Sequence, residues 1–411
     1  MENRSPFARP VCLAAAAALC AGCGGPPQNP APREPSRYFG NMPLSIDPTL
    51  ATGIFHFTDH HIREDSNLLA LHIGWFPIPW AEFAAGTDPP PAWLAEMDAI
   101  SALRDRLGLP VYLALNPLNG DRDSLEVQAT GTTVLSARPF GGRCEPIASR
   151  PDYATVVLPA YLAYVEYMVE RFRPRFLATS VEVNVYAINC PAAWADMKAL
   201  VNDVYLDQKS RHPELPVFQT FQIEGLWGGD AGVPASRDSL ARNMTSIADL
   251  RSDIFAMSTY PIATYVAHNR ALPDDYLTVF STLQLAPLAI SETGYSSSTV
   301  WAIDSSGSCT PLLPSSVGDQ RWWVDRVIAD ADRLNMPFVT WWANEDPIPA
   351  AELTGGCGCT DTTVWCNFLQ MLDAGAQSGL RFFSPMGLRE FDGTPRPARA
   401  DWTAAVQGAA L

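Results

Sequence analysis

Two glutamates follow apolar segments that have the composition of buried strands. Glu182 ends the run Phe-Leu-Ala-Thr-Ser-Val that begins at Phe176, and Glu292 ends the run Leu-Ala-Ile-Ser that begins at Leu288. A glutamate that closes a buried strand is unfavourable unless water, a partner or a substrate contacts its carboxylate. Either residue alone is equally compatible with a salt bridge that fastens a loop. Together they predict two carboxylates that share one cleft.

Two carboxylates in one cleft can hydrolyse a glycosidic bond, because one can hold a proton while the other holds a charge. The protonated group assists the departing oxygen, and the ionised group attacks the sugar or activates water. A cleft separates these roles by burying one carboxyl and hydrogen-bonding the other. A retaining reaction predicts carboxyl groups about 5–5.5 Å apart, and an inverting reaction predicts about 6.5–9.5 Å.

The elements that must position these glutamates are strands that alternate with helices. Eight apolar or β-branched runs have the length and composition of strands buried on both faces. They are Gly53–Thr58, Leu68–Gly74, Val111–Leu115, Phe176–Val183, Val217–Phe221, Ile254–Tyr260, Leu288–Glu292 and Phe338–Trp342. Amphipathic helical segments lie between them, at Ala92–Leu107, Tyr161–Phe172, Ala192–Lys209, Ser236–Leu250 and Gln320–Leu334.

This alternation predicts an α/β fold, a single-domain (β/α)8 TIM barrel over residues 51–411 with disulfide-stapled loops. An open doubly wound sheet is the alternative, and it normally has fewer strands and a glycine-rich first turn. In a barrel the functional side chains lie at the carboxyl ends of the strands. Glu182 and Glu292 close the fourth and seventh predicted strands, so the barrel would direct both into the same mouth.

Three short motifs give a resemblance to a known group of enzymes. The run Ser-Glu-Thr-Gly-Tyr at 291–295 resembles the Glu-Thr-Gly-aromatic signature of several members of glycoside hydrolase clan A. The run Met-Ser-Thr-Tyr-Pro at 257–261 resembles the segment before the Tyr-Pro of the family 53 endo-β-1,4-galactanases. Trp341 and Trp342 stand where the clan commonly places a tryptophan that stacks on substrate. The similarity spans residues 50–350.

The resemblance implies a retaining glycoside hydrolase that acts on a β-linked polysaccharide or oligosaccharide, with galactan as a candidate. Glu182 would be the acid/base and Glu292 the nucleophile. The sequence departs from the clan at Val181, where the clan has an asparagine that contacts the sugar 2-hydroxyl. Asn184 is a candidate for that role. The departure also motivates an alternative hypothesis, a non-catalytic carbohydrate-binding surface lipoprotein that keeps the hydrolase-like barrel.

Further side chains near the predicted strand ends are candidates for substrate binding. The resemblance implies that Tyr260 hydrogen-bonds Glu292 and helps keep it ionised. Trp341 and Trp80 are candidates for stacking on sugar rings, although packing of loops or core is the alternative for both. His72 and Arg122 could contact a sugar or a carboxylate, and their alternatives are a satisfied barrel histidine and a surface ion pair.

The sequence indicates neither a cofactor nor a metal centre. A metal-dependent barrel hydrolase would need a cluster of His and Asp ligands at the mouth. Only His56 and His72 fall on the predicted strands, and no His-Glu-x-x-His helix, Gly-x-Ser-x-Gly elbow or phosphate-binding glycine loop is present.

The formal net charge of −16 disfavours nucleic acid as a partner, because an acidic surface repels phosphate backbones. An acidic surface of this kind also serves solubility.

The amino terminus predicts export. Residues 1–23 combine early arginines, a short apolar run and Cys-Ala-Gly-Cys at 20–23, which resembles a bacterial lipobox with Cys23 as the lipidated residue. An ordinary cleaved signal is the alternative. Residues 24–50, rich in proline and glycine at their start, are predicted to be a tether. We therefore expect an exported lipoprotein at the cell envelope, attached to the membrane through an N-terminal lipid anchor.

Six cysteines remain after the predicted signal, an even number that suggests three disulfides in an exported protein. We expect Cys144 to pair with Cys190, and Cys309 to pair with one of Cys357, Cys359 and Cys366. A zinc site formed by the last three is the alternative, but their spacing is not a usual zinc pattern and no histidine lies nearby.

Overall fold

The protein is a closed barrel of eight parallel strands. The computed structural model describes residues 34–47, 55–130, 133–136, 142–229, 235–263, 272–283, 286–303, 309–352, 364–371 and 374–409, and Pro35–Leu411 form one compact unit. Around the barrel the strands are β1 (Tyr38–Asn41), β4 (Leu68–His72), β5 (Val111–Ala114), β8 (Phe176–Ser180), β9 (Val217–Gln222), β10 (Phe255–Thr259), β11 (Leu288–Thr293) and β14 (Phe338–Trp341). This topology confirms the predicted (β/α)8 TIM barrel.

The first strand of the barrel is not the one that the sequence predicted. Instead of Gly53–Thr58, the barrel is closed by β1, which pairs in parallel with both β14 and β4. The predicted segment contains β3 (Phe55–Phe57), which forms an antiparallel hairpin with β2 (Leu44–Ile46) outside the barrel. The tether predicted over residues 24–50 therefore overlaps the barrel. Both runs are short and apolar, and only the pairing with distant strands distinguishes them.

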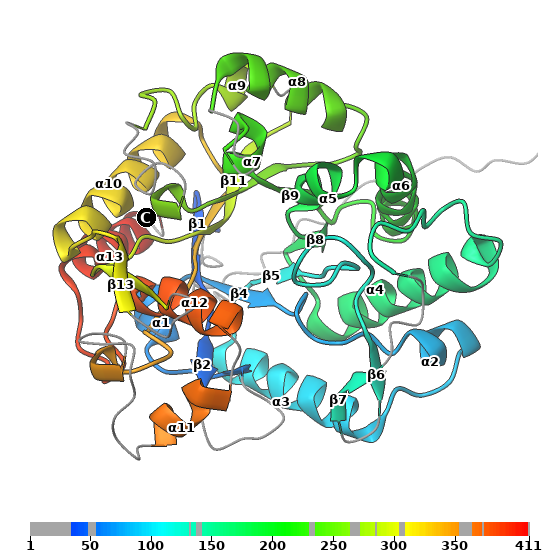
Figure 1. Ribbon diagram of the computed structural model, residues 1–411, viewed down its shortest axis with the longest axis horizontal. Helices are drawn as coiled ribbons and strands as arrows, with labels where there is room; N and C mark the ends of the chain where they lie inside the picture. Colours follow the sequence, from blue (N-terminus) through cyan, green and yellow to red (C-terminus); the bar gives the residue numbers. More distant parts are fainter. Residues whose placement is uncertain are drawn as a thin grey trace, which may run out of the picture. The chain divides into compact units, whose positions relative to one another are not determined.

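Helices surround the strands, as Figure 1 shows. The longer ones are α3 (Pro91–Leu107), α4 (Leu158–Phe172), α6 (Trp194–Arg211), α8 (Arg237–Ile247), α10 (Val317–Arg333), α12 (Ala374–Phe383) and α13 (Pro397–Ala409). Shorter helices are α1 (Ile62–Asp65), α2 (Trp80–Ala85), α5 (Val183–Asn189), α7 (Ile223–Trp227), α9 (Phe280–Leu283) and α11 (Val364–Met371). Two further hairpins pair β6 (Gln128–Thr130) with β7 (Thr133–Ser136) and β12 (Val300–Ile303) with β13 (Cys309–Leu313).

Local sequence explains why these helices form where they do. Helix α3 begins at Pro91, whose fixed φ suits the first helical position and whose missing N–H is not needed there. Helix α10 is capped by Ser316, whose side chain accepts a hydrogen bond from the backbone N–H of Asp319. The five helices predicted from the sequence are all present with boundaries shifted by a few residues.

An aromatic layer fills the barrel interior beneath the strand ends. Phe338 lies against Phe176, with ring centroids 4.6 Å apart, and against Tyr112 at 5.1 Å. Phe218 completes the layer beside Tyr112. The ring of His72 packs edge-on to the ring of Tyr112, with centroids 5.5 Å apart. The polar side chains of the mouth therefore begin with His72, directly above the aromatic layer. The layer makes the barrel a packed core with its polar chemistry at one end.

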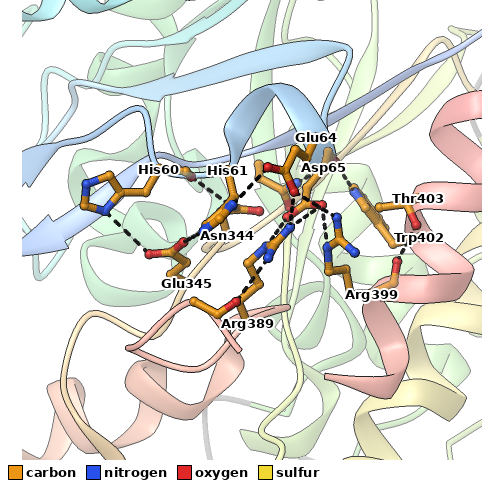
Figure 2. Close-up of polar contacts among 12 residues, drawn as sticks. His60, His61, Glu64, Asp65, Asn344, Glu345, Arg389, Arg399, Trp402 and Thr403 are labelled. Atoms are coloured by element: carbon orange, nitrogen blue, oxygen red, sulfur yellow. Dashed lines mark hydrogen bonds and ion pairs between the residues drawn. The ribbon is translucent and has the colours of Figure 1, made fainter. Parts of the chain in front are cut away.

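A buried ionic cluster fastens the C-terminal segment to the start of the barrel. Figure 2 shows Arg389 and Arg399 pointing toward Glu64 and Asp65 on α1. Asp65 is fully buried, and it accepts from Nε of Arg389 at 2.7 Å and from Nε of Arg399 at 2.6 Å. Breaking a buried pair by removing one partner is strongly destabilising, because it leaves an uncompensated charge. The cluster therefore holds α13 against α1.

One predicted disulfide is confirmed. Cys144 and Cys190 are bonded across a sequence separation of 46 residues, with their Cα atoms 5.0 Å apart. The other predicted pairing, of Cys309 with a later cysteine, lies outside the side chains that the structure describes. None of the helices in the described ranges combines the length and the apolar character needed to cross a membrane.

Candidate active site

Glu182 lies directly after β8 and has an unusual backbone conformation. Its φ of 52° and ψ of 42° place it in the left-handed region, which a residue with a Cβ rarely adopts. The backbone N–H of Glu182 donates to Thr220 Oγ1 at 2.8 Å, which holds the turn. Strained backbone of this kind is concentrated at functional sites. The side chain keeps 16% exposure.

Both carboxylate oxygens of Glu182 have partners in the ligand-free protein. Oε2 lies 3.0 Å from Nη2 of Arg122, and Oε1 accepts from the hydroxyl of Ser258 at 2.8 Å. Arg122 is one of the substrate-binding candidates from the sequence, with a surface ion pair as the alternative, and in the structure it is paired with Glu182. Its Nη1 donates to the carbonyl oxygen of Gly120 at 2.6 Å, so the guanidinium is held between the loop after β5 and the glutamate.

Glu292 lies within β11, next to its end, and is almost completely buried, with 8% exposure. The hydroxyl of Tyr260 donates to Oε1 at 2.5 Å, as the sequence predicted. His72 lies on the other side, with Nδ1 3.3 Å from Oε2 in a polar contact that lacks hydrogen-bond geometry. The predicted residues Tyr260 and His72 therefore both contact the nucleophile candidate.

Burial and the second carboxylate set the protonation of Glu292. The pKa of Glu292 is raised to about 8, first by burial and then by the charge of Glu182, while the Tyr260 hydrogen bond and Arg122 lower it. Burial also lowers the pKa of His72 to about 4, which leaves a neutral ring beside Glu292. The two glutamates thus act on each other electrostatically within one site.

The tryptophans chosen from the sequence do not line the mouth. Trp341 is 1% exposed, and its indole N–H donates to the carbonyl oxygen of Met386 at 2.7 Å. Trp80 is fully buried, and its indole N–H donates to the carbonyl oxygen of Glu126 at 3.0 Å. Successive side chains of a strand point to opposite faces, so a two-residue Trp-Trp run can present only one ring to the mouth. In the structure, the ring on the side of the mouth is that of Trp342.

Trp342 belongs to an aromatic group beside Glu292. Its ring lies 5.1 Å from that of Trp75, 4.5 Å from that of Phe383 and 6.3 Å from that of Tyr260. Its indole N–H is buried and has no partner among the described residues. Aromatic faces and an uncommitted donor suit a sugar, which presents C–H faces and hydroxyls.

Asn184 does not have the role that the sequence suggested. Its Oδ1 accepts from the backbone N–H of Gln222 at 2.8 Å, and its Nδ2 donates to the Gln222 carbonyl oxygen at 2.9 Å. Both functions of the amide are used to join α5 to the end of β9. His56 lies on β3 in the hairpin outside the barrel and is also not part of the site.

Three polar residues of the site escaped the sequence analysis. Ser258 contacts Glu182, Thr220 holds its backbone, and Oδ1 of Asn116 accepts from the N–H of Val181 at 3.2 Å. Each lies on, or just after, a barrel strand. The signal that could have identified these three residues was their position near a strand end. Small polar residues are common at such positions, so this signal does not distinguish them.

Gly294 in the Glu-Thr-Gly-Tyr run is required by close packing. A Cβ at this position would lie 2.7 Å from Sδ of Met386, 3.1 Å from Cε1 of Tyr260 and 3.3 Å from Cβ of Trp342. These distances are shorter than ordinary contacts, so a larger residue would displace the ring that binds Glu292. The motif glycine therefore serves the geometry of the site.

No group of three His, Cys, Asp or Glu side chains in the described part of the chain is placed to hold a metal ion.

Comparison with known proteins identifies the fold. No protein-family model and no curated protein sequence matches the chain. Among solved structures, a GH5_18 protein from Bifidobacterium longum subsp. longum ATCC 55813, in complex with Manb1-4GlcNAc, superposes with a TM-score of 0.53 at 13% identity, over 85% of this chain and 71% of that one. The chain therefore shares the barrel fold of that GH5_18 protein.

Two further structures have the same barrel. The exo-β-1,4-mannosidase Op5Man5 from Opitutaceae bacterium strain TAV5 superposes with a TM-score of 0.51 at 13% identity, over 84% of this chain. This chain spans 54% of the length of that mannosidase. A structure of fungal β-1,4-galactanases superposes with a TM-score of 0.50 at 12% identity, over 84% of this chain and 90% of that one. At these identities the comparison concerns the fold, which agrees with the clan A resemblance.

Proposed function

We propose that the protein is a retaining glycoside hydrolase that cleaves a β-linked polysaccharide or oligosaccharide. The observation that carries the proposal is that Glu182 and Glu292, 110 positions apart in the sequence, accept hydrogen bonds from Ser258 and Tyr260, which lie two positions apart at the end of β10. Glu292 attacks the anomeric carbon while Glu182 gives its proton to the departing oxygen. Glu182 then takes a proton from water, which attacks the same carbon and releases Glu292.

The reaction requires the site to change its protonation when substrate binds. In the free protein Glu182 is paired with Arg122, and burial favours a proton on Glu292. Attack needs the opposite arrangement, with a charged Glu292 and a protonated Glu182. The leaving oxygen of the sugar would therefore have to open the ion pair between Glu182 and Arg122. Tyr260 supports the charged state of Glu292 through its hydrogen bond.

The proposal is tested by assaying the purified protein on dyed β-linked polysaccharides, galactan and mannan among them. Glu182→Ala and Glu292→Ala should each abolish the release of reducing ends. Glu214→Ala, which removes an exposed glutamate between α6 and β9, should leave it unchanged. NMR of the first-formed anomer should show retention, and an inverted product would contradict the assignment of Glu292 as nucleophile.

The alternative function is carbohydrate binding without turnover. Val181 supports it, because this residue is 2% exposed and packs in the barrel interior, where its side chain can bind no sugar hydroxyl. Saturable binding of a polysaccharide by the wild-type protein, with no reducing ends released, would establish this alternative. Loss of turnover on Glu292→Ala would exclude it.

We also propose that the chain is an exported lipoprotein, with residues 1–23 as the signal and Cys23 as the lipidated residue. The support is the sequence pattern, since these residues lie outside the described part of the chain. Incorporation of labelled palmitate that is lost in Cys23→Ala would establish the anchor. Secretion of an unlabelled, cleaved protein would indicate an ordinary signal.

A further inference from the structure

Asn116 is a buried polar residue at the site that no step of the proposed reaction uses. It lies two positions after β5 and is 2% exposed. Its Oδ1 accepts from the N–H of Val181, and Thr220 Oγ1 accepts from the N–H of the next residue, Glu182. Asn116, just after β5, and Thr220, on β9, thus accept from the N–H groups of two consecutive residues after β8. Asn116 is therefore fixed against the turn that presents Glu182.

The other half of the Asn116 amide is uncommitted. Nδ2 is buried and has no hydrogen-bond partner among the described residues. A buried donor without a partner is unfavourable, and such a group in a native structure calls for an explanation. The structure also makes room for this side chain, because a Cβ on Gly74 would lie 2.7 Å from Cβ of Asn116. An alanine at position 74 would force the asparagine to move.

We propose that Nδ2 of Asn116 donates a hydrogen bond to the hydroxyl on the carbon next to the anomeric carbon of the bound sugar. The inference rests on the proposed hydrolase function. Oδ1 is tied to the residue that precedes Glu182, so the free donor lies beside the reacting centre and not at a distant part of the substrate. Val181 itself offers no side-chain donor there. Hydrogen bonds to this hydroxyl strengthen in the transition state of glycoside hydrolysis.

Nδ2 is covered by neighbouring atoms, so the proposed contact requires these atoms to move aside when a sugar enters the mouth. Binding then gives a partner to a group that lacks one. Asn116 would contribute to the rate and would also distinguish sugars with a free 2-hydroxyl from sugars without one. Asn116 would thus have two roles: its amide oxygen positions the turn that carries Glu182, and its amide nitrogen binds the substrate. The test must separate these two roles.

The test compares two substrates, each assayed with wild-type protein and Asn116→Ala. The first is the 4-nitrophenyl β-glycoside, chosen among galactobioside, mannobioside and cellobioside, that the wild type cleaves fastest, and the second is its 2-deoxy analogue. We expect the substitution to lower kcat by about tenfold or more on the first substrate, the effect of one lost hydrogen bond. On the 2-deoxy analogue the loss should be markedly smaller, because the partner hydroxyl is absent.

Two further variants separate the donor from the backbone contact. Asn116→Asp keeps the oxygen that accepts from Val181 but removes the donor, and it should show the same difference between the two substrates. Asn202→Ala is the matched control, since Asn202 on α6 also bonds backbone groups through both halves of its amide, at Arg251 and Asp249. It should leave kcat on both substrates unchanged.

Equal losses on the two substrates would overturn the inference, because Asn116 would then act only by holding the backbone. In that case the hydrolase function would stand. Absence of turnover by the wild type on all three glycosides and on the polysaccharides would overturn the hydrolase proposal, and this inference with it.

Discussion

Substitution of Tyr260 by phenylalanine removes the hydrogen bond to Glu292 and leaves the ring in place. The hydroxyl donates to Oε1 at 2.5 Å and lowers the pKa of Glu292, which burial and Glu182 nevertheless keep raised at about 8. A hydrogen bond to a charged group contributes roughly 1.5–3 kcal/mol, and about 1.4 kcal/mol corresponds to one pKa unit. We therefore expect the pKa of Glu292 in Tyr260→Phe to rise by about one to two units.

The nucleophile must be ionised, so kcat/KM rises with pH through the pKa of Glu292 in the free protein. In Tyr260→Phe this rising limb should move to higher pH, and its plateau should be lower because the ionised carboxylate has lost a partner. The assay is kcat/KM against pH on the cleaved 4-nitrophenyl glycoside. Tyr205→Phe is the matched control, since Tyr205 donates to Asp253 at 2.8 Å away from the site. An unshifted limb in Tyr260→Phe, or an equal shift in the control, would refute the reasoning.

Three other predictions concern stability and packing. Because the pKa of Glu292 is raised from 4.5 to about 8, chiefly by burial, its contribution to the free energy of unfolding is full below pH 4.5 and is lost as the pH rises from there to about 8. Urea unfolding of Glu292→Gln should lack this decline, and parallel stability curves for the two proteins would contradict the prediction. Replacing Cys144 and Cys190 by serine should lower the free energy of unfolding by about 4 kcal/mol, from the entropy of the 46-residue loop, and a change below about 1 kcal/mol would mean that the loop is already constrained. Gly294→Ala should overpack the site at a cost of about 1–3 kcal/mol and lower kcat, whereas Gly408→Ala, which meets open space, should do neither.

The barrel could be predicted from the sequence because its signal is local. Seven of the eight predicted strands are in the barrel, since each is an apolar run long enough to be buried on both faces. The exception is the first strand of the barrel. Gly53–Thr58 and Tyr38–Asn41 are similar short apolar runs, and the closing strand is decided by pairing with β14, about 300 positions away along the chain.

The two glutamates and three of the residues that contact them were also accessible from the sequence. Glu182 and Glu292 were found because a carboxylate at the end of a buried strand is unusual, and the barrel topology then implies that they meet. Arg122, Tyr260 and His72 followed from their places near strand ends. Residue type and position along a strand were sufficient to identify these residues, because the carboxyl ends of all eight strands converge.

Side-chain direction was not accessible in the same way. Trp341 and Trp342 are adjacent and identical in type, and only the register of β14 against its neighbours brings the second against Tyr260, which hydrogen-bonds Glu292. Asn184 and Asn116 are likewise indistinguishable as residues, yet one spends both halves of its amide on the backbone and the other keeps a donor free. The sequence by itself determined the barrel and its two carboxylates, because apolar periodicity and residue type are local properties. The tertiary structure alone decided which aromatic and amide groups face them, because that depends on the register between strands far apart in the chain.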